Sequence, residues 1–276
     1  MRKIVVLSFI ASSVLFAQSD LKLSYVVTDY DNSKTKIDGT SYEVGLSHDF
    51  GIGVLGFGYE DSAVDRIGTN PTLEVQKVNL NYSHKLSKEL GAKVSYLKID
   101  DNIAPTDDGK VYGFGVGYAI AEGFALTTDL YKSDYKQFNV SQVDITLAKN
   151  FMMGDIKSKA IVGVKKIDID GDKYNAYTFK DKDYTTSLVA LSTNYNGYTA
   201  NIGTMFGKRL FAVLENGAKV QHHAVEQDKT YFVGFGKKIG SFDVMAKYSY
   251  QNGIELPENR KDVDTKTSSI TLTYKF

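Results

Sequence analysis

The sequence of 276 residues contains no cysteine and only three prolines, and both shortages restrict what the chain can be. Without cysteine it has no disulfides, no thiolate ligands for a metal and no attachment point for a cysteine-linked lipid. Proline is scarce while glycine (24), tyrosine (19) and phenylalanine (15) are abundant, and this balance favours β-structure. These absences exclude several classes of protein but select none.

Long hydrophobic runs are also missing from most of the chain. Beyond residue 17 there is no run of about 18 apolar residues, the length that a membrane-spanning helix needs, so a helical membrane protein is excluded. A β-barrel is not excluded, because only alternate residues of its strands face lipid. The 33 basic and 33 acidic side chains balance, and nothing indicates a nucleic-acid partner.

The N-terminus has the pattern of a secretory signal peptide. Arg2 and Lys3 precede a largely apolar stretch over residues 4–16, and Ala17 stands directly before polar residues. Leu15 is larger than the small residue usual at that position, but an uncleaved anchor is disfavoured because the apolar stretch is short. We therefore predict a signal peptide over residues 1–17 and one mature domain over residues 18–276.

Most of the mature chain alternates between apolar and polar residues. Val78, Leu80 and Tyr82 alternate with Lys77 and Asn79, and this period of two places the apolar set on one face of a strand. The same pattern predicts about fourteen strands, near residues 20–29, 40–50, 52–60, 75–86, 91–99, 110–120, 122–132, 140–151, 157–167, 184–195, 198–207, 229–239, 241–251 and 266–276. Twelve or sixteen strands remain alternatives, because residues 157–167 and 208–228 alternate less cleanly.

The connections between these strands alternate in length. Tight turns such as Asn196-Gly197 and Gly240 follow the even strands, and longer polar segments, which contain all three prolines, follow the odd ones. Short periplasmic turns, long extracellular loops and an even strand number are what an antiparallel up-and-down transmembrane β-barrel requires. A soluble all-β protein would bury the apolar face instead, and alternation alone does not tell which face points inward. The signal peptide and the loop asymmetry favour the all-β transmembrane barrel.

The last strand places Ile270, Leu272, Tyr274 and Phe276 on its apolar face, and the sequence ends on that phenylalanine. This ending resembles that of the Gram-negative outer-membrane β-barrel family, in which it implies recognition by the barrel-assembly machinery. By strand count the chain looks like the monomeric fourteen-strand porins. The resemblance implies a location in the bacterial outer membrane, contact with its lipid, and a monomer or small oligomer.

The predicted inner face carries charges that could line a pore. Nine lysines against six carboxylates suggest a slight anion preference, and ion pairing across neighbouring strands is an equally good interpretation. Small residues such as Gly113, Gly115 and Gly117 leave room for water, and no long segment that could form a plug precedes the first strand. The candidate pore-lining residues are Glu43, Lys77, Lys93, Asp129, Asp144, Lys165, Asp243 and Lys247.

We therefore predict a porin-like channel for passive diffusion of small hydrophilic solutes and ions. The main alternative is a barrel whose loops form an adhesin or receptor surface, and an outer-membrane lipid-acting enzyme is a weaker one. The apolar loop 208–228 could constrict the lumen, extend the barrel as a hairpin around Asn216-Gly217, or contact a partner.

No catalytic set, metal or cofactor is predicted. His48 and His84 could each act with an adjacent serine, but adjacent residues of a strand point to opposite faces. The acidic residues 168, 170 and 172 resemble the start of a calcium loop, whose closing glutamate is replaced by Phe179. The adjacent pair His222-His223 lacks a second ligand cluster, so it is weak evidence for a metal site.

A gel experiment tests the barrel prediction by itself. Because a closed barrel should resist dodecyl sulfate without heating, we expect the unheated refolded chain to migrate differently from the boiled one. Identical migration of a chain that is folded by circular dichroism would contradict a transmembrane barrel.

Overall fold

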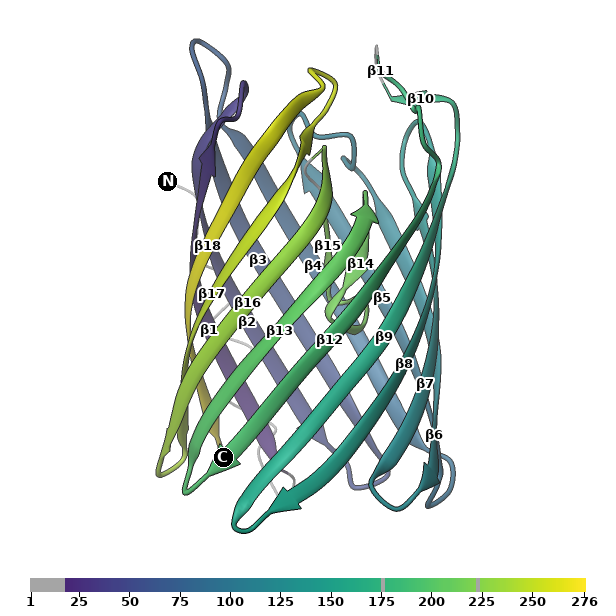
Figure 1. Cartoon of the computed structure of the whole chain (residues 1–276), viewed down its shortest axis with the longest axis vertical. Coiled ribbons are helices and arrows are strands. Elements are labelled where there is room, and N and C mark those ends of the chain that lie inside the picture. The colour runs from purple at the N-terminus through teal and green to yellow at the C-terminus, as the bar shows by residue number, and fades with distance from the viewer. Residues whose placement is uncertain (1–17, 175–176, 222–223) are drawn as a thin grey trace.

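A computed structural model describes residues 18–174, 177–221 and 224–276 of the chain. Within these ranges, fourteen antiparallel strands form one closed barrel, each hydrogen-bonded to its neighbours in chain order (Figure 1). The expected fold class and the expected strand number are both confirmed. The predicted signal peptide, residues 1–17, lies outside the described residues.

The elements of the barrel and its inserts have the following bounds. The barrel strands are β1 (Ser19–Asp31), β2 (Lys36–Asp49), β3 (Gly53–Arg66), β4 (Leu73–Lys85), β5 (Leu90–Asp101), β6 (Lys110–Ala121), β7 (Phe124–Asp134), β8 (Asn139–Met153), β9 (Ile156–Asp170), β12 (Asp183–Tyr195), β13 (Tyr198–Arg209), β16 (Val225–Ile239), β17 (Phe242–Glu255) and β18 (Arg260–Lys275). Two short hairpins are inserted, β10 (Lys173–Tyr174) with β11 (Tyr177–Thr178), and β14 (Val213–Leu214) with β15 (Lys219–Val220) around a 3-10 turn, η2 (Glu215–Gly217).

The strands extend further into the long loops than the sequence indicates. β3 continues to Arg66, β9 to Asp170, and β18 begins already at Arg260, each several residues beyond the predicted bound. Beyond the lipid the outward residues become polar, such as Asp61 and Asp168, while inward residues such as Val64 and Ile169 are apolar, so the apolar-out pattern that marks the strand in the sequence is lost. The backbone ladder needs no such alternation and continues.

The barrel closes between its first and last strands. β1 pairs with β18 from Asp20↔Lys275 to Asp31↔Asp264. At the seam, the amide of Ser19 donates to the carbonyl of Phe276 and the amide of Phe276 donates to the carbonyl of Ser19, both at 3.0 Å. The sheet therefore has no free edge, which lipid could not solvate.

The two ends of the barrel differ, and we call them the turn end and the loop end. Tight turns at the turn end use left-handed residues, such as Asn196 (φ 49°) followed by Gly197 (φ 77°). Two successive positive φ values match the twist of a two-residue hairpin. The C-terminus lies at this turn end, while the longer connections gather at the opposite end (Figure 1).

The outer wall is an apolar band with lysines near both limits. Lys149 at the turn end lies 3.8 Å from the ring centroid of Phe124, and Lys237 lies 4.6 Å from that of Tyr198. Lys98 is the outward lysine near the loop end of β5. Among the described residues, no helix is long and apolar enough to cross a membrane.

The loop-end half of the interior is packed with apolar side chains. Leu97, Ile99, Val111, Val140 and Ile167 point inward from four strands, and each is at most 1% exposed. The lumen therefore differs from the uniformly water-filled pore that the small glycines of the inner face suggest. The apolar loop 208–228 supplies the reason, because it folds into the barrel and buries these side chains.

A buried carboxylate fastens the β1–β2 loop to β17 beyond the loop-end limit of the apolar band. Glu255 is fully buried and accepts hydrogen bonds from Ser33 Oγ (2.8 Å), the Lys34 amide (2.7 Å) and Lys36 Nζ (2.8 Å). Burial by itself would raise the pKa of Glu255, but the charge of Lys36 and these hydrogen bonds outweigh it and lower the pKa to about 2.

Replacing this carboxylate tests the fastening. Glu255→Ala leaves the buried ammonium of Lys36 without its carboxylate, so we expect a loss of about 3 to 5 kcal/mol in the free energy of unfolding. Urea unfolding of the refolded barrel in detergent micelles measures it. Glu258→Ala, at an exposed position of the β17–β18 loop directly after Glu255, is the matched control, and equal midpoints for both variants would contradict the role of Glu255.

Candidate functional site in the barrel lumen

The inner face of the wall changes character from the loop end to the turn end. On β4 the inward side chains are Val75, then Lys77, then Asn79, and on β8 they are Val140, then Gln142 and Asp144. A belt of charge therefore lies at mid-height, directly below the apolar packing. We call it the charged belt, and its members are Glu60, Lys77, Lys93, Asp129, Asp144 and Lys165.

The charges of the belt pair across strands. Lys77 Nζ lies 2.8 Å from Glu60 Oε1 on the adjacent strand, and Lys165 bonds to Asp144, which stands directly opposite in the β8–β9 register. Both pairs are largely buried. This arrangement matches the pairing interpretation of the inner charges.

A third pair bridges two strands that are not neighbours. Lys93 Nζ on β5 lies 3.0 Å from Asp129 Oδ2 on β7, and β6 runs between them. Gly115 of β6 makes this possible, because a Cβ atom there would collide with Asp129 Oδ1 and with Lys93 Cε. The absence of a side chain at position 115 thus leaves room for a charge pair.

The hairpin β14–β15 lies inside the barrel (Figure 1), where it contacts Lys93 and Lys165 of the charged belt. We call residues 213–220 the lumen hairpin. Gln142 holds its start by accepting a hydrogen bond from the Val213 amide (2.8 Å) and donating one to the Val213 carbonyl (2.9 Å). At its tip, Lys93 Nζ donates to Asn216 Oδ1 at 2.9 Å, and beyond it Lys219 bonds to Glu43 on β2.

Apolar packing anchors the segment that leads into the lumen hairpin. Phe211 is fully buried, with ring centroids 4.7 Å from Phe138, 6.0 Å from Tyr135 and 6.3 Å from Phe179. These partners come from the loops that follow β7 and β9. Of the three placements that the sequence left open for this loop, the structure thus has the one inside the lumen.

A cavity of about 690 Å³ remains between the lumen hairpin and the opposite wall. That wall is formed by β12, β13, β16, β17, β18 and β1, which contribute hydroxyl, amide and lysine side chains beside apolar ones such as Leu188, Met205 and Phe232. Its polar contributors include Lys22, Ser24, Ser192, Asn201, Thr230, Lys247, Ser249, Gln251, Thr267, Ser269 and Thr271. Water and small polar solutes fit such a lining.

The eight candidate pore-lining residues fall into three groups. Five of them line this cavity, namely Glu43, Asp129, Asp144, Lys165 and Lys247. Lys77 is only 3% exposed, and Lys93 supports the tip of the lumen hairpin. Asp243 lies at the turn end, where it pairs with Lys275 (2.7 Å) beside a second cavity of about 550 Å³.

Sequence reasoning missed the residues that fasten the lumen hairpin. Lys219 lies in a loop whose position inside the lumen depends on the folded barrel. Its partner Glu43 is 176 positions away in the sequence. Gln142 is on the inner face by parity, but an inward glutamine has no pattern that indicates a bond to one particular loop. No local signal would have found either contact.

The histidines on the wall do not form the pairs considered from the sequence. His48 Nδ1 lies 2.8 Å from Ser19 Oγ on the neighbouring strand, and His84 Nδ1 lies 2.9 Å from the hydroxyl of Tyr82. Neither contact involves the adjacent serines at positions 47 and 83. The pair His222-His223 lies outside the described residues.

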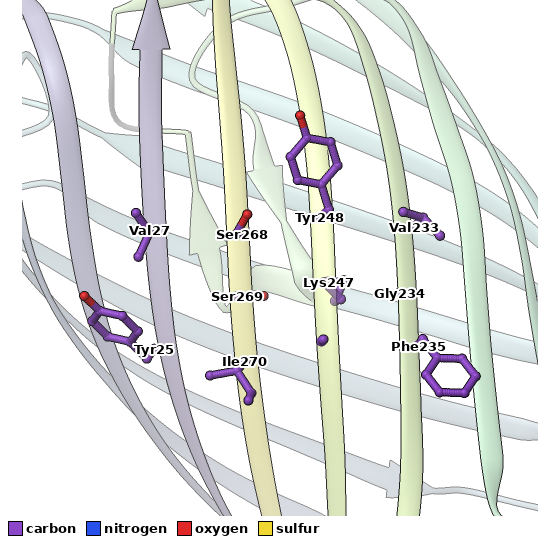
Figure 2. A pocket seen from close by; sticks show the side chains of 11 residues that line it. Tyr25, Val27, Val233, Gly234, Phe235, Lys247, Tyr248, Ser268, Ser269 and Ile270 are labelled. Carbon is purple, nitrogen blue, oxygen red and sulfur yellow. The ribbon is translucent and has the colours of Figure 1, made fainter.

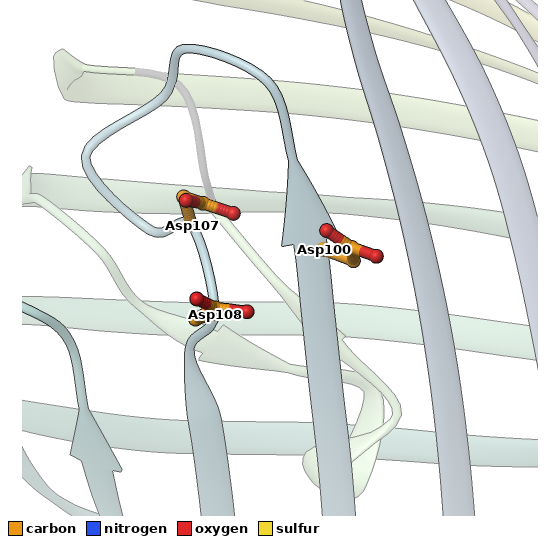
Figure 3. Close-up of side chains that lie close together, drawn as sticks. All are labelled: Asp100, Asp107 and Asp108. Atoms are coloured by element: carbon orange, nitrogen blue, oxygen red, sulfur yellow. The ribbon is translucent and has the colours of Figure 1, made fainter.

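One group of carboxylates at the loop end has the spacing of a cation site. Asp100, Asp107 and Asp108 point toward one another (Figure 3). Lys136 already bonds to Asp107 and lies 2.9 Å from Asp108, so one lysine ammonium offsets part of the charge of these three carboxylates. In the segment that resembles a calcium loop, Asp172 pairs with Lys182 at 2.7 Å.

A groove of about 490 Å³ lies on the lipid-facing side of the wall, over β1, β16, β17 and β18 (Figure 2). Tyr25, Val233, Phe235 and Ile270 border it, and Ala246 leaves it hollow. The groove is apolar and separate from the lumen, with the wall between them. It belongs to the surface that faces the acyl chains.

The closed antiparallel barrel, with an apolar outer band and a charged interior at mid-height, has the architecture of transmembrane β-barrels. No protein-family model matches the sequence, and no curated protein matches it. The fold matches many solved outer-membrane barrels. All of the matches described below are below 10% identity, so they establish the fold alone.

Three solved structures illustrate the match. A "Bacterial polysaccharide outer membrane secretin" has a TM-score of 0.58 at 9% identity, with 94% of this chain and 98% of that chain covered. The "CymD monoaromatic hydrocarbon channel" has 0.58 at 9% identity, covering 95% and 88%. The toluene transporter TbuX of Ralstonia pickettii has 0.56 at 8% identity, covering 95% and 90%.

A buried carboxyl at the loop end gives the loops a pH dependence. Asp101 lies beyond Lys98, outside the apolar band, and is 8% exposed. Burial raises its pKa to about 6, although hydrogen bonds from the amides of Ala104 and Ile103 oppose the shift. An acid with a raised pKa in the folded state binds a proton there at a pH where the unfolded chain has lost it.

Stability should therefore fall as pH rises from about 4 to about 6, and stay level above that range. We expect Asp101→Asn to remove this dependence, because Asn Oδ1 can accept the same amide hydrogen bonds without a charge. Urea midpoints of both proteins between pH 4 and pH 8 measure the difference. Asp100→Asn, at the exposed neighbouring position, should retain the wild-type slope, and parallel curves for wild type and Asp101→Asn would disprove the assignment.

Proposed function

We propose that the protein is a channel of the bacterial outer membrane for small hydrophilic solutes, narrowed by its own lumen hairpin. The observation that carries the proposal is the cavity of about 690 Å³, lined by charged and hydroxyl side chains among apolar ones, inside a lipid-facing barrel. A barrel that served only to display loops would need no polar space in its interior. Solved channels and transporters among the structural neighbours support the channel fold, but not a solute.

The proposed orientation places the loop end outside the cell and the turn end in the periplasm. The short turns and the C-terminal strand lie together at one end, as an outer-membrane barrel requires. The alternate apolar residues Ile270, Leu272 and Tyr274 are exposed on the outer wall of β18, beside the terminal Phe276. We propose that this face is recognised by the barrel-assembly machinery and afterwards faces lipid.

The lumen hairpin sets the width of the proposed path. Polar solutes would pass between it and the hydroxyl-rich wall, because its other side bonds to the charged belt. On the loop-end side of the lumen hairpin, the apolar packing around Phe211 fills the lumen beside this path. Movement or removal of the segment would thus widen the lumen at its narrowest level.

Replacing residues 210–224 with a short Gly/Ser turn tests this proposal. Because the segment fills the lumen and its loss opens the cross-section, we expect the single-channel conductance to at least roughly double. Planar-bilayer recordings of the refolded mature protein, in symmetric salt, measure it.

The control is the same replacement of residues 67–72, an exposed connection between β3 and β4, which should leave conductance unchanged. Absence of channel openings in both the wild type and the shortened barrel, each confirmed as folded by its gel shift, would refute a channel. It would favour a surface-binding barrel instead.

A further inference from the structure

The two sides of the lumen cavity differ in how their charges are satisfied. On the hairpin side, the carboxylates of Glu43, Asp129 and Asp144 each bond to a lysine. Glu215 of the lumen hairpin lies 3.8 Å from Lys219 Nζ, which Glu43 also binds. The carboxylates of this side are therefore all compensated, in part by sharing one ammonium.

On the opposite wall, Lys247 faces the cavity without a carboxylate partner, and Lys22 only shares one. Lys247 on β17 is exposed to the cavity, and within the described ranges no carboxylate oxygen lies within 4.0 Å of its Nζ. Its recorded neighbour is the ring of Phe232, at 6.0 Å. The side chain of Lys22 on β1 is 45% exposed, and its nearest carboxylate, Glu43 at 3.9 Å, already binds Lys219.

Hydroxyl groups run between these lysines along β18. Lys247 stands opposite Ser269 in the β17–β18 register, and Lys22 stands opposite Thr273 in the β1–β18 register. Thr271 lies between them and exchanges a hydrogen bond with Ser24 at 3.0 Å. Figure 2 shows Lys247 and Ser269 side by side on neighbouring strands. Inward hydroxyls of one strand thus connect two ammonium groups.

A buried guanidinium adds positive potential at the loop-end side of the cavity. Arg209 is 2% exposed and donates to Gln227 and Thr230, and Thr230 lines the cavity. Its Nε and Nη1 atoms have no hydrogen-bond partner among the described residues. Asp228 is the acid whose charge acts on it. Because low-dielectric walls focus such fields, the β16–β18 side of the cavity attracts anions.

We propose that Lys247, with the hydroxyls of Ser269 and Thr271, binds the oxyanion of a small solute, either a carboxylate or a phosphate, and that Lys22 is the next contact toward the turn end. The ammonium supplies the charge and the hydroxyls donate the further hydrogen bonds that an oxyanion accepts. This inference deepens the proposed channel by naming its solute class, although binding can be measured without transport.

Equilibrium dialysis of the refolded protein with labelled succinate, and separately with labelled inorganic phosphate, tests the site. We expect saturable binding of at least one probe, and the stronger probe identifies carboxylate or phosphate as the natural group. Lys247→Gln should weaken that binding about tenfold, which corresponds to roughly 1.4 kcal/mol for a charge-assisted hydrogen bond.

Lys132→Gln, an outward lysine on β7, makes the same charge change without facing the lumen and should bind as the wild type does. Absence of saturable binding to the wild type, or equal binding by Lys247→Gln, would overturn the site. Glu215→Gln should strengthen binding, since it removes from the cavity a negative charge that shares Lys219 with Glu43. Weaker binding by Glu215→Gln would also count against the site.

Bilayer recordings separate this inference from the channel proposal. A conducting barrel without saturable anion binding would leave the channel intact and refute the site. A silent barrel that binds succinate or phosphate, and loses that binding in Lys247→Gln, would refute the channel and support the site.

Discussion

Backbone hydrogen bonding in a medium without water is the constraint on which the rest of this structure depends. Every strand must find partners on both sides, and the reciprocal bonds of Ser19 and Phe276 complete the last seam. Once the sheet is closed, alternate side chains are divided between lipid and lumen. The apolar face of each strand is thus committed to the outside, and the polar residues, which a soluble protein would expose, are enclosed.

Side chains enclosed in the lumen must also find partners, and they do so differently at mid-height and near the loop end. At mid-height, buried charges pair across strands, as Lys77 does with Glu60, and Gly115 provides room for the pair that crosses β6. Near the loop end, apolar inward residues are covered by the segment around Phe211. The lumen hairpin meets both levels, so its position follows from packing above and charge pairing below.

The same division explains why the cavity is asymmetric. The hairpin lies against one side of the wall, where Gln142 hydrogen-bonds to Val213 and Glu43 pairs with Lys219. The carboxylates on that side are therefore already paired with lysines. The opposite wall keeps hydroxyls and two accessible lysines. An asymmetric lumen of this kind gives a solute a defined path beside the hairpin.

The sequence by itself determined the class of fold, the fourteen strands and the direction of their faces, because the period of two is a local property of each strand. It also placed Glu43, Asp129, Asp144, Lys165 and Lys247 on the inner face by parity. Only the tertiary structure decided which of these charges pair, where the strands end beyond the lipid, and where loop 208–228 lies. Those features depend on contacts between residues far apart in the chain, such as Lys219 with Glu43, and no local pattern encodes them.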